Sequence, residues 1–213
     1  MWKSSEDFFS KPKISFNFQY HELQVKIETQ RLYICSYQDN DFENCVSLYG
    51  NKEITKYFDH GKARSRVEVE NLISERGKTY FIKGQPFGLF SVFSKYSMNF
   101  MGQVDLVPTN ELGTVEIGCI LHKQYQDQNF GTESVIALAV HYVDELNFRN
   151  IKFNGKAICK VMGTVHPKNV PSNKILKKLG MTFDKYEERF GNPRLWYSYV
   201  PKSAYVENQK IAR

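Results

Sequence analysis

The stretch Thr114–Gly131, TVEIGCILHKQYQDQNFG, followed directly by TESVIALAVHYVDEL at 132–146, decides the fold of this chain. Its first part alternates between two sets of side chains, which predicts a β-strand, because successive side chains of a strand point to opposite faces. The apolar residues of its second part recur at helical spacing, which predicts an amphipathic helix. We therefore expect a strand, a polar turn that contains Gly131, and a long helix.

The turn between this strand and helix brings several backbone N–H groups to one point. The first N–H groups of a helix have no partner within the helix, and the helix dipole adds a positive potential there. A phosphate or pyrophosphate binds readily at such a place. Taken alone, this stretch is explained equally well by an ordinary strand-to-helix turn without a ligand.

Three motifs, in this order, resemble the GNAT superfamily of N-acetyltransferases. The turn 126–131, QDQNFG, is similar to the coenzyme A loop, which reads Arg or Gln, two residues, Gly, one residue, then Gly or Ala; Asn129 stands in place of the first Gly. The runs ETQRLYICSYQDND (28–41) and VHPKNVPSNKILKKLGM (165–181) are similar to signatures of the branch of RimJ/RimL-type ribosomal-protein N-terminal acetyltransferases. The resemblance covers roughly residues 27 to 200.

This resemblance implies a fold and a reaction. The fold is α/β (α+β), with a mixed, mostly antiparallel, twisted sheet, helices on both faces, and central strands splayed around the acyl-CoA. The reaction is transfer of an acetyl group from acetyl-CoA to a primary amine within one ternary complex, without a covalent intermediate.

Length and composition predict a single globular domain. The chain has 213 residues, of which 41% are hydrophobic and 24% charged, as in ordinary soluble proteins. We expect the domain at residues 23–201, an N-terminal arm at 1–22 that packs on it, and a polar tail at 202–213. The aromatic residues expected to dock the arm are Phe8, Phe9, Phe16, Phe18 and Tyr20.

Charge and composition exclude several other classes of protein. The net charge is +6, but the Lys and Arg residues are scattered without a basic helix, which favours a small anionic ligand such as coenzyme A over nucleic acid. No apolar run approaches the ~20 residues that cross a bilayer, and the N-terminus lacks the apolar core of a secretory signal. The four cysteines form no CxxC pair and the five histidines show no ligand spacing, so we expect reduced thiols and no metal. We therefore expect a cytoplasmic protein without a membrane partner, either a monomer or a homodimer.

Turn and capping residues predict the other elements. Strands are expected at 23–29, 31–37, 86–94, 98–107, 161–166, 181–190 and 194–201. Helices are expected from a cap at Asp39 or Asn40 to Gly50, at 52–58, from the Ser65/Glu68 capping box to Gly77, and from Asn169 to Gly180. Two turns are expected, Asn154-Gly155 within a small hairpin or flap at 148–160, and Gly191-Asn192-Pro193 between the last two strands.

By this resemblance, the polar turn holds the pyrophosphate of coenzyme A through backbone N–H groups. Gly131 has no Cβ and lets the backbone approach the ligand closely. Asn tolerates positive φ better than most residues, so we expect Asn129 to preserve the turn. Lys174 and Lys178 are candidates for the 3′-phosphate. The implied cofactor-binding residues are Ile120, Leu121, Gln126, Gln128, Asn129, Phe130, Gly131, Thr132, Asn169 and Lys178.

The reaction needs a neutral amine, N–H donors for the thioester oxygen and a proton for the leaving thiolate. Glu116 is the candidate general base, acting through water; the alternative is a carboxylate that only orients the acceptor or pairs with a cation. Many GNAT enzymes protonate the thiolate with a Tyr where this chain has Leu176, and the resemblance implies Ser172 in that role. Cys119 offers a covalent acetyl-cysteine route, but a buried structural thiol is the simpler interpretation.

The acceptor is expected to be the N-terminal amine of a protein or peptide, because the resembled branch acts there. At pH 7 roughly one-tenth of α-amino groups are neutral, against about one lysine in a few thousand. Polyamines, aminoglycosides and amino acids are alternatives, and a non-catalytic CoA-binding sensor or interaction module is a further one. By resemblance Tyr57, Phe58 and His60 touch the acceptor; packing in the core or on the surface explains them equally well.

Overall fold

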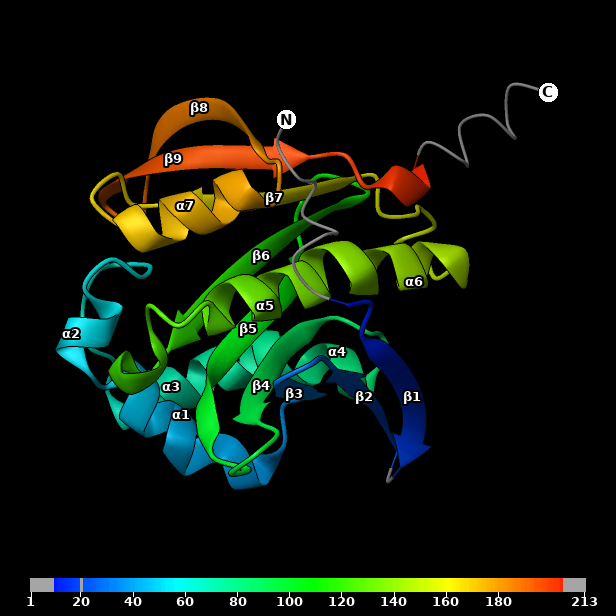
Figure 1. Cartoon of the computed structure of the whole chain (residues 1–213), viewed down its shortest axis with the longest axis horizontal. Helices are drawn as coiled ribbons and strands as arrows, with labels where there is room; N and C mark the ends of the chain where they lie inside the picture. Colours follow the sequence, from blue (N-terminus) through cyan, green and yellow to red (C-terminus); the bar gives the residue numbers. More distant parts are fainter. Residues whose placement is uncertain (1–9, 20, 205–213) are drawn as a thin grey trace.

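One nine-stranded sheet runs through the part of the chain that the computed structural model describes, residues 10–19 and 21–204 (Figure 1). Its strand order is β1-β2-β3-β4-β5-β6-β7-β9-β8, and among these strands only β6 and β7 run parallel. The strands are β1 Lys13–Gln19, β2 Glu22–Glu28, β3 Leu32–Ser36, β4 Gly88–Ser94, β5 Phe100–Pro108, β6 Thr114–Leu121, β7 Lys160–Val165, β8 Thr182–Arg189 and β9 Asn192–Tyr199.

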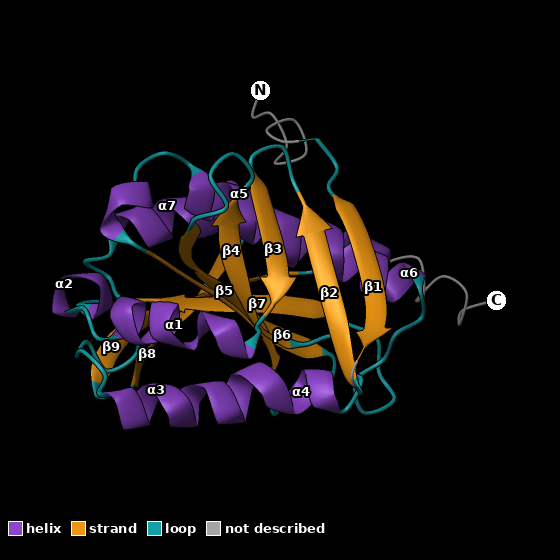
Figure 2. Cartoon of the chain, turned by 90° about the horizontal axis from the view of Figure 1, so that it is seen from below, coloured by secondary structure: helices purple, strands orange, loops and turns teal. Residues whose placement is uncertain are grey.

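Helices cover both faces of this sheet (Figure 2). Helices α1, α3 and α4 lie on one face, and α5, α6 and α7 lie on the other. Their bounds are α1 Phe42–Tyr49, α2 Lys52–Thr55, α3 Arg66–Leu72, α4 Thr79–Ile82, α5 Phe130–Ile136, α6 Val143–Phe148 and α7 Val170–Lys178. The mixed, mostly antiparallel sheet with helices on both faces confirms the expected fold class.

The strand, turn and long helix expected from the opening stretch are all present. Helix α5 continues through a π-helical segment, Ala137–Tyr142, into α6. The predicted apolar face of this helix is at most 2% exposed throughout: Val135, Ala139, Tyr142, Val143 and Leu146. The helix therefore forms the centre of the main hydrophobic core.

The N-terminal hairpin covers part of this long helix. Strand β1 pairs antiparallel with β2, and the Phe16 ring stacks on Tyr142 with 5.8 Å between ring centroids. Phe18 is 61% exposed and so does not dock as expected. Phe8, Phe9, Tyr20 and the tail beyond residue 204 lie outside the described residues. Residues 13–19, expected within an appended arm, are thus an edge strand of the sheet itself.

The helix that begins at the Ser65/Glu68 capping box does not end at Gly77, so that prediction is wrong. The chain continues through a π-helical segment, Ile73–Lys78, into α4. A Cβ on Gly77 would lie 3.4 Å from Leu89 Cδ1, and one on Gly88 would lie 2.8 Å from the carbonyl oxygen of Gly77. These glycines therefore let the helix pack closely on β4. The helix ends instead before Gly84, whose φ is +68°.

Three further local predictions are corrected. The cap expected at Asp39 or Asn40 is replaced by a 3₁₀ turn, Asp39–Asp41, and the carboxylate of Asp41 accepts a 2.7 Å hydrogen bond from Ser91. The helix expected at 52–58 covers only Lys52–Thr55. The last hairpin turns at Phe190 and Gly191, with φ of 57° and 67°, whereas Asn192 and Pro193 pair within the ladder. A two-residue turn of this kind needs positive φ at both positions.

The hairpin expected within 148–160 is confirmed at its turn. Phe153 and Lys156 form an antiparallel bridge around Asn154 and Gly155, both with positive φ. Within residues 10–19 and 21–204, no helix is long and apolar enough to cross a membrane. Over the same residues, no group of three or more His, Cys, Asp or Glu side chains could hold a metal ion.

Candidate active site

The sheet opens between its two parallel strands. Strands β6 and β7 pair only at their starts, where Thr114, Val115 and Glu116 face Lys160, Val161 and Met162. Beyond these pairs a cavity of about 470 Å³ lies along the rest of β6, Ile117 to Leu121, and along Thr164 and Val165 of β7. The strands thus separate at the middle of the fold and leave room for a ligand between them.

The loop between β6 and α5 forms one end of this cavity. Asn129 adopts the left-handed conformation, with φ 63° and ψ 9°, which confirms that Asn supports the turn in place of Gly. A Cβ on Gly131 would lie 3.3 Å from Ile175 Cδ1 and 3.6 Å from Leu121 Cδ1, so the loop, β6 and α7 approach closely here. Among the described residues, no acceptor is found for the backbone N–H groups of 128–132. These N–H groups at a helix start fit the needs of a diphosphate.

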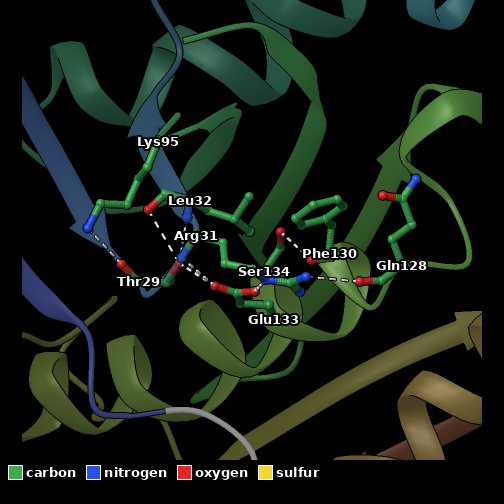
Figure 3. A network of polar contacts seen from close by, with 8 residues as sticks. All are labelled: Thr29, Arg31, Leu32, Lys95, Gln128, Phe130, Glu133 and Ser134. Carbon is green, nitrogen blue, oxygen red and sulfur yellow. Dashed lines mark hydrogen bonds and ion pairs between the residues drawn. The ribbon is translucent and has the colours of Figure 1, made fainter. Parts of the chain in front are cut away.

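An ion pair between Arg31 and the buried Glu133 holds this loop in place (Figure 3). The Glu133 side chain is 1% exposed and accepts hydrogen bonds from Arg31 Nε at 2.7 Å, from the Arg31 backbone N–H at 3.0 Å and from Thr29 Oγ1 at 2.6 Å. Arg31 Nη1 also donates to the carbonyl oxygen of Gln128 at 3.2 Å, and its guanidinium lies 4.2 Å from the centroid of the Phe130 ring. Arg31 was part of a quoted motif, but nothing in the sequence pairs it with Glu133.

Most of the cofactor-binding residues expected from the sequence line the cavity. They are Ile120, Leu121, Gln126, Asn129, Gly131, Thr132, Asn169 and Lys178. Gln128 and Phe130 do not line it. Gln128 donates from its amide to the carbonyl oxygen of Gln124, and Phe130 packs against Arg31 and Tyr125. The side chains of these two residues therefore support the loop rather than the cavity wall.

Helix α7 provides the cavity wall next to this loop. Asn169 caps the helix by accepting a 3.3 Å hydrogen bond from the Ser172 backbone N–H. Ser172 and Leu176 both line the cavity, as does Lys174. Lys178 Nζ lies 3.3 Å from Asn129 Oδ1, which joins the end of α7 to the loop. The face of α7 that carries these side chains is therefore turned toward the opening.

Glu116, the expected base, lines the cavity but is engaged in an ion pair. Arg189 binds it through two hydrogen bonds, 2.6 Å to Oε1 and 3.0 Å to Oε2, and Thr164 Oγ1 lies 3.4 Å from Oε1. Arg189 comes from β8, far along the chain, so the sequence did not indicate this pairing. The arrangement matches the alternative in which Glu116 pairs with a cation.

A second carboxylate, which the sequence analysis missed, lies beside Glu116. Asp105 of β5 pairs with Gly118 of β6, and a Cβ on Gly118 would lie 2.1 Å from Asp105 Oδ1. Burial raises the pKa of Asp105 from its ordinary value near 3.8 to about 7, although the nearby Arg76 guanidinium opposes this shift. The sequence signal was a single carboxylate in a mostly apolar strand.

The α2 region and the last hairpin form another part of the cavity wall. Tyr57 and Phe58 line it, whereas His60 does not and packs edge-on against Phe190 at 5.2 Å. Arg194, which is 3% exposed, donates to the carbonyl oxygens of Tyr57 and Asp59. Arg194 therefore holds the segment after α2 against the sheet.

Cys119 also lines the cavity. Burial raises the pKa of its thiol to about 12, so the thiol stays protonated near neutral pH. A protonated thiol is a weak nucleophile, which disfavours an acetyl-cysteine route.

Comparisons with known proteins agree with this geometry. Residues 31–182 match the family model of the acetyltransferase (GNAT) domain. The chain is 22% identical over 160 residues to the uncharacterized N-acetyltransferase YnaD of Bacillus subtilis, covering 74% of this chain and 82% of that protein.

Two solved structures share the fold. One is the RimL ribosomal L7/L12 α-N-protein acetyltransferase in complex with coenzyme A, with a TM-score of 0.63, 15% identity, and 82% of this chain and 96% of that chain covered. The other is spermidine N-acetyltransferase from Vibrio cholerae in complex with CoA and spermine, with a TM-score of 0.61, 16% identity, and 82% and 98% covered. With the family model matching most of the chain, the protein belongs to the GNAT family of acetyltransferases and is an N-acetyltransferase.

Proposed function

We propose that this enzyme transfers the acetyl group of acetyl-CoA to the N-terminal α-amino group of a protein or peptide. The observation that carries the proposal is the opening between β6 and β7, which joins the loop at the start of α5 to a wall of carboxylates. A cofactor held by the loop would present its thioester in this opening, beside the acceptor amine.

The proposed cofactor site consists of backbone N–H groups in the loop before α5 and of side chains at the start and on the face of α7. Backbone N–H groups of 128–132 hold the diphosphate, and the left-handed Asn129 and the small Gly131 keep them accessible. Asn169 and Ser172 contact the pantetheine arm, and Lys174 and Lys178 meet the 3′-phosphate. Support for this placement comes from the RimL and spermidine acetyltransferase structures, both of which were solved in complex with coenzyme A.

The α-amino acceptor is favoured by its chemistry. An α-amino group needs less help to lose its proton than a lysine does. The RimL structure, described as a ribosomal L7/L12 α-N-protein acetyltransferase, supports the same choice through its fold. The resemblance of the quoted motifs to the RimJ/RimL-type branch points the same way.

A polyamine is the second candidate acceptor. Its support is a group of carboxylates along the cavity, which would attract a ligand with several ammonium groups: Glu53, Asp59, Asp105 and Glu116. Asp127 also lines the cavity, within the loop before α5. The spermidine acetyltransferase solved in complex with spermine has the same fold. This wall also carries Arg76 and Arg194, so the attraction is partly offset.

The proposed chemistry is direct transfer. The neutral amine attacks the thioester carbonyl, and Ser172 delivers a proton to the leaving thiolate, directly or through water. Glu116, the base expected from the sequence, either relays the amine proton through water or holds Arg189 in place. The unpaired state of all four cysteines supports the further proposal that the protein works in a reducing compartment such as the cytoplasm. As a separate proposal, the protein is a monomer or homodimer.

The test is an acceptor panel with free thiol as the readout. The panel compares a lysine-free peptide with an open N-terminus, the same peptide N-acetylated but carrying one lysine, and spermine. Thiol release that needs the open N-terminus supports the proposal, and release with spermine alone supports the second candidate. Ser172→Ala should lower kcat by roughly tenfold or more with little change in acetyl-CoA affinity. If acetyl-CoA binds but no amine releases thiol, the proposed function is wrong.

A further inference from the structure

Two carboxylates of the cavity wall differ in what surrounds them. Both oxygens of Glu116 accept hydrogen bonds from Arg189, at 2.6 Å and 3.0 Å, and Thr164 adds a further contact. A base must present an open lone pair to the proton that it removes. Glu116 could do so only by giving up part of a bidentate ion pair, which is among the stronger hydrogen-bonded arrangements in proteins.

Asp105 is not held in a bidentate ion pair of this kind. Within residues 10–19 and 21–204 its carboxylate accepts a hydrogen bond from its own backbone N–H but none from a side chain, and the residue lines the same cavity. Its Oδ1 occupies the space that a side chain at position 118 would fill, because Asp105 and Gly118 are partners in the β5–β6 ladder. The carboxylate therefore lies over β6 at the point where that strand has left β7.

The geometry points to Asp105 as the general base that takes the proton from the acceptor ammonium. This inference rests on the proposed function, since it assigns the base for acetylation of an amine. It moves the base from the strand that carries the cofactor loop to the neighbouring strand β5.

The proton balance of the step is complete. The acceptor enters as R–NH₃⁺ and gives one proton to the Asp105 carboxylate. The nitrogen lone pair forms the C–N bond to the thioester carbon, and the C–S bond breaks with its electron pair leaving on sulfur. A second nitrogen proton passes to the thiolate, with Ser172 as the proposed relay, and the third remains on the amide. Asp105 then releases its proton to solvent.

The surroundings of Asp105 suit this role. Burial raises its pKa to about 7, close to the value at which a base works best near neutral pH. The charged and titratable groups that face it from neighbouring elements are Arg76, Glu116, Asp59, Tyr49 and Cys119. Arg76 favours the ionised carboxylate, while Glu116 and Asp59 oppose it. Ionised Asp105 and its acidic neighbours would also attract the incoming ammonium.

The first test uses the unmodified enzyme and a simple primary alkylamine that stays protonated across the assay range. With Asp105 as the base, kcat/KM for the amine should rise to pH 7 and then level, because the ionised carboxylate and the ammonium are then both present. A kcat/KM that keeps rising about tenfold per pH unit well above pH 7 would mean that the enzyme takes neutral amine from solution. That result would overturn the inference.

The second test compares Asp105→Asn with Glu116→Gln, both of which preserve side-chain size. Asp105→Asn should lower kcat about 10²–10³-fold, keep the acetyl-CoA Kd within about twofold, and lose the levelling near pH 7. Glu116→Gln should still show a levelling, but at a lower pH, because it removes a negative charge that raises the pKa of Asp105. The defect of Asp105→Asn should shrink for an acceptor whose amine is already neutral at the assay pH, a response that a purely structural role would not produce.

Different results would overturn the assignment of Asp105 as the base and the proposed acetyltransferase function. The inference is overturned if the wild-type enzyme is active and Asp105→Asn keeps the wild-type pH profile of kcat/KM. It is also overturned if only Glu116→Gln loses that pH profile. Either result leaves the acetyltransferase function intact. No thiol release from the wild-type enzyme with any amine overturns the proposed function instead. If Asp105→Asn does not fold, the wild-type profile decides the inference.

Discussion

Arg31 and Glu133, 102 residues apart in the chain, form an ion pair that holds the loop between β6 and α5. Arg31 lies in the turn between β2 and β3, and Glu133 lies in the first turn of α5 with 1% of its side chain exposed. The same guanidinium reaches the carbonyl oxygen of Gln128, so the loop and the helix start are held by one side chain. The position of the N–H groups that would hold a diphosphate therefore depends on a contact between the β2–β3 turn and the start of α5.

Replacing Arg31 should loosen that loop. Arg31→Ala leaves the buried Glu133 without its cation, although the Thr29 hydroxyl and the backbone N–H of residue 31 still donate to it, so we expect a cost of about 1–3 kcal/mol of stability. We expect a lower free energy of unfolding in urea and weaker acetyl-CoA binding by calorimetry. The matched control is Arg66→Ala, which breaks the exposed pair of Arg66 with Glu43 and should change neither measurement appreciably. Equal effects of the two variants would show that burial of Glu133 does not matter.

The left-handed conformation of Asn129 gives a second prediction. Asn129→Gly should keep the loop, since glycine adopts positive φ without strain. Asn129→Val should cost roughly 1–2 kcal/mol, because a β-branched residue is strained there, and should weaken acetyl-CoA binding. Thermal unfolding with and without acetyl-CoA measures both effects. Equal binding by the Gly and Val variants would contradict the role given to this conformation.

The raised pKa of Asp105 predicts a pH-dependent stability. In the folded protein Asp105 is protonated up to about pH 7, whereas the unfolded chain releases this proton near pH 3.8. The folded state therefore binds more protons between these values, and stability from this group is lost as pH rises through that window. Asp105→Asn cannot ionise, so it should match wild-type near pH 4 and exceed it at pH 8.5 by on the order of 3 kcal/mol.

Urea unfolding at the two pH values provides the measurement for Asp105→Asn. Asp184→Asn, at an exposed position of β8, is the control and should show no such pH-dependent gain. A variant Asp105→Asn that is less stable than wild-type at pH 8.5 would mean that Arg76 stabilises the ionised carboxylate more than burial penalises it.

Gly118 provides a test of the Asp105 position. In Gly118→Ala the new Cβ would lie 2.1 Å from Asp105 Oδ1, so the carboxylate must move. We expect a loss of about 1–3 kcal/mol of stability and a fall in kcat larger than the change in acetyl-CoA affinity. The double variant Gly118→Ala with Asp105→Ala removes the colliding oxygen, and its stability cost should be clearly smaller than the sum of the single costs. Additive costs would contradict the close packing of these two residues.

Local patterns account for the parts of the fold that the sequence predicted correctly. Alternation in 114–121 and helical spacing after Gly131 specify a strand, a turn and a buried helix face, because each pattern reports which neighbours share a face. The left-handed conformation of Asn129 was also predicted from a local property, because Asn tolerates positive φ better than most residues. Gly77 misled the prediction because a glycine serves either to end a helix or to allow close packing, and only the nearby β4 strand decides between these uses.

What the sequence alone determined was the order and type of most elements and, through three motifs, the resemblance to an acetyltransferase family. Only the tertiary structure paired Glu116 with Arg189, Glu133 with Arg31, and Asp105 with the space over Gly118. Each of these contacts depends on strand order and register, which join residues far apart in the chain and leave no local periodic signal. The physical reason is that a side chain's charge state and partners depend on burial and on neighbours that only the folded sheet provides.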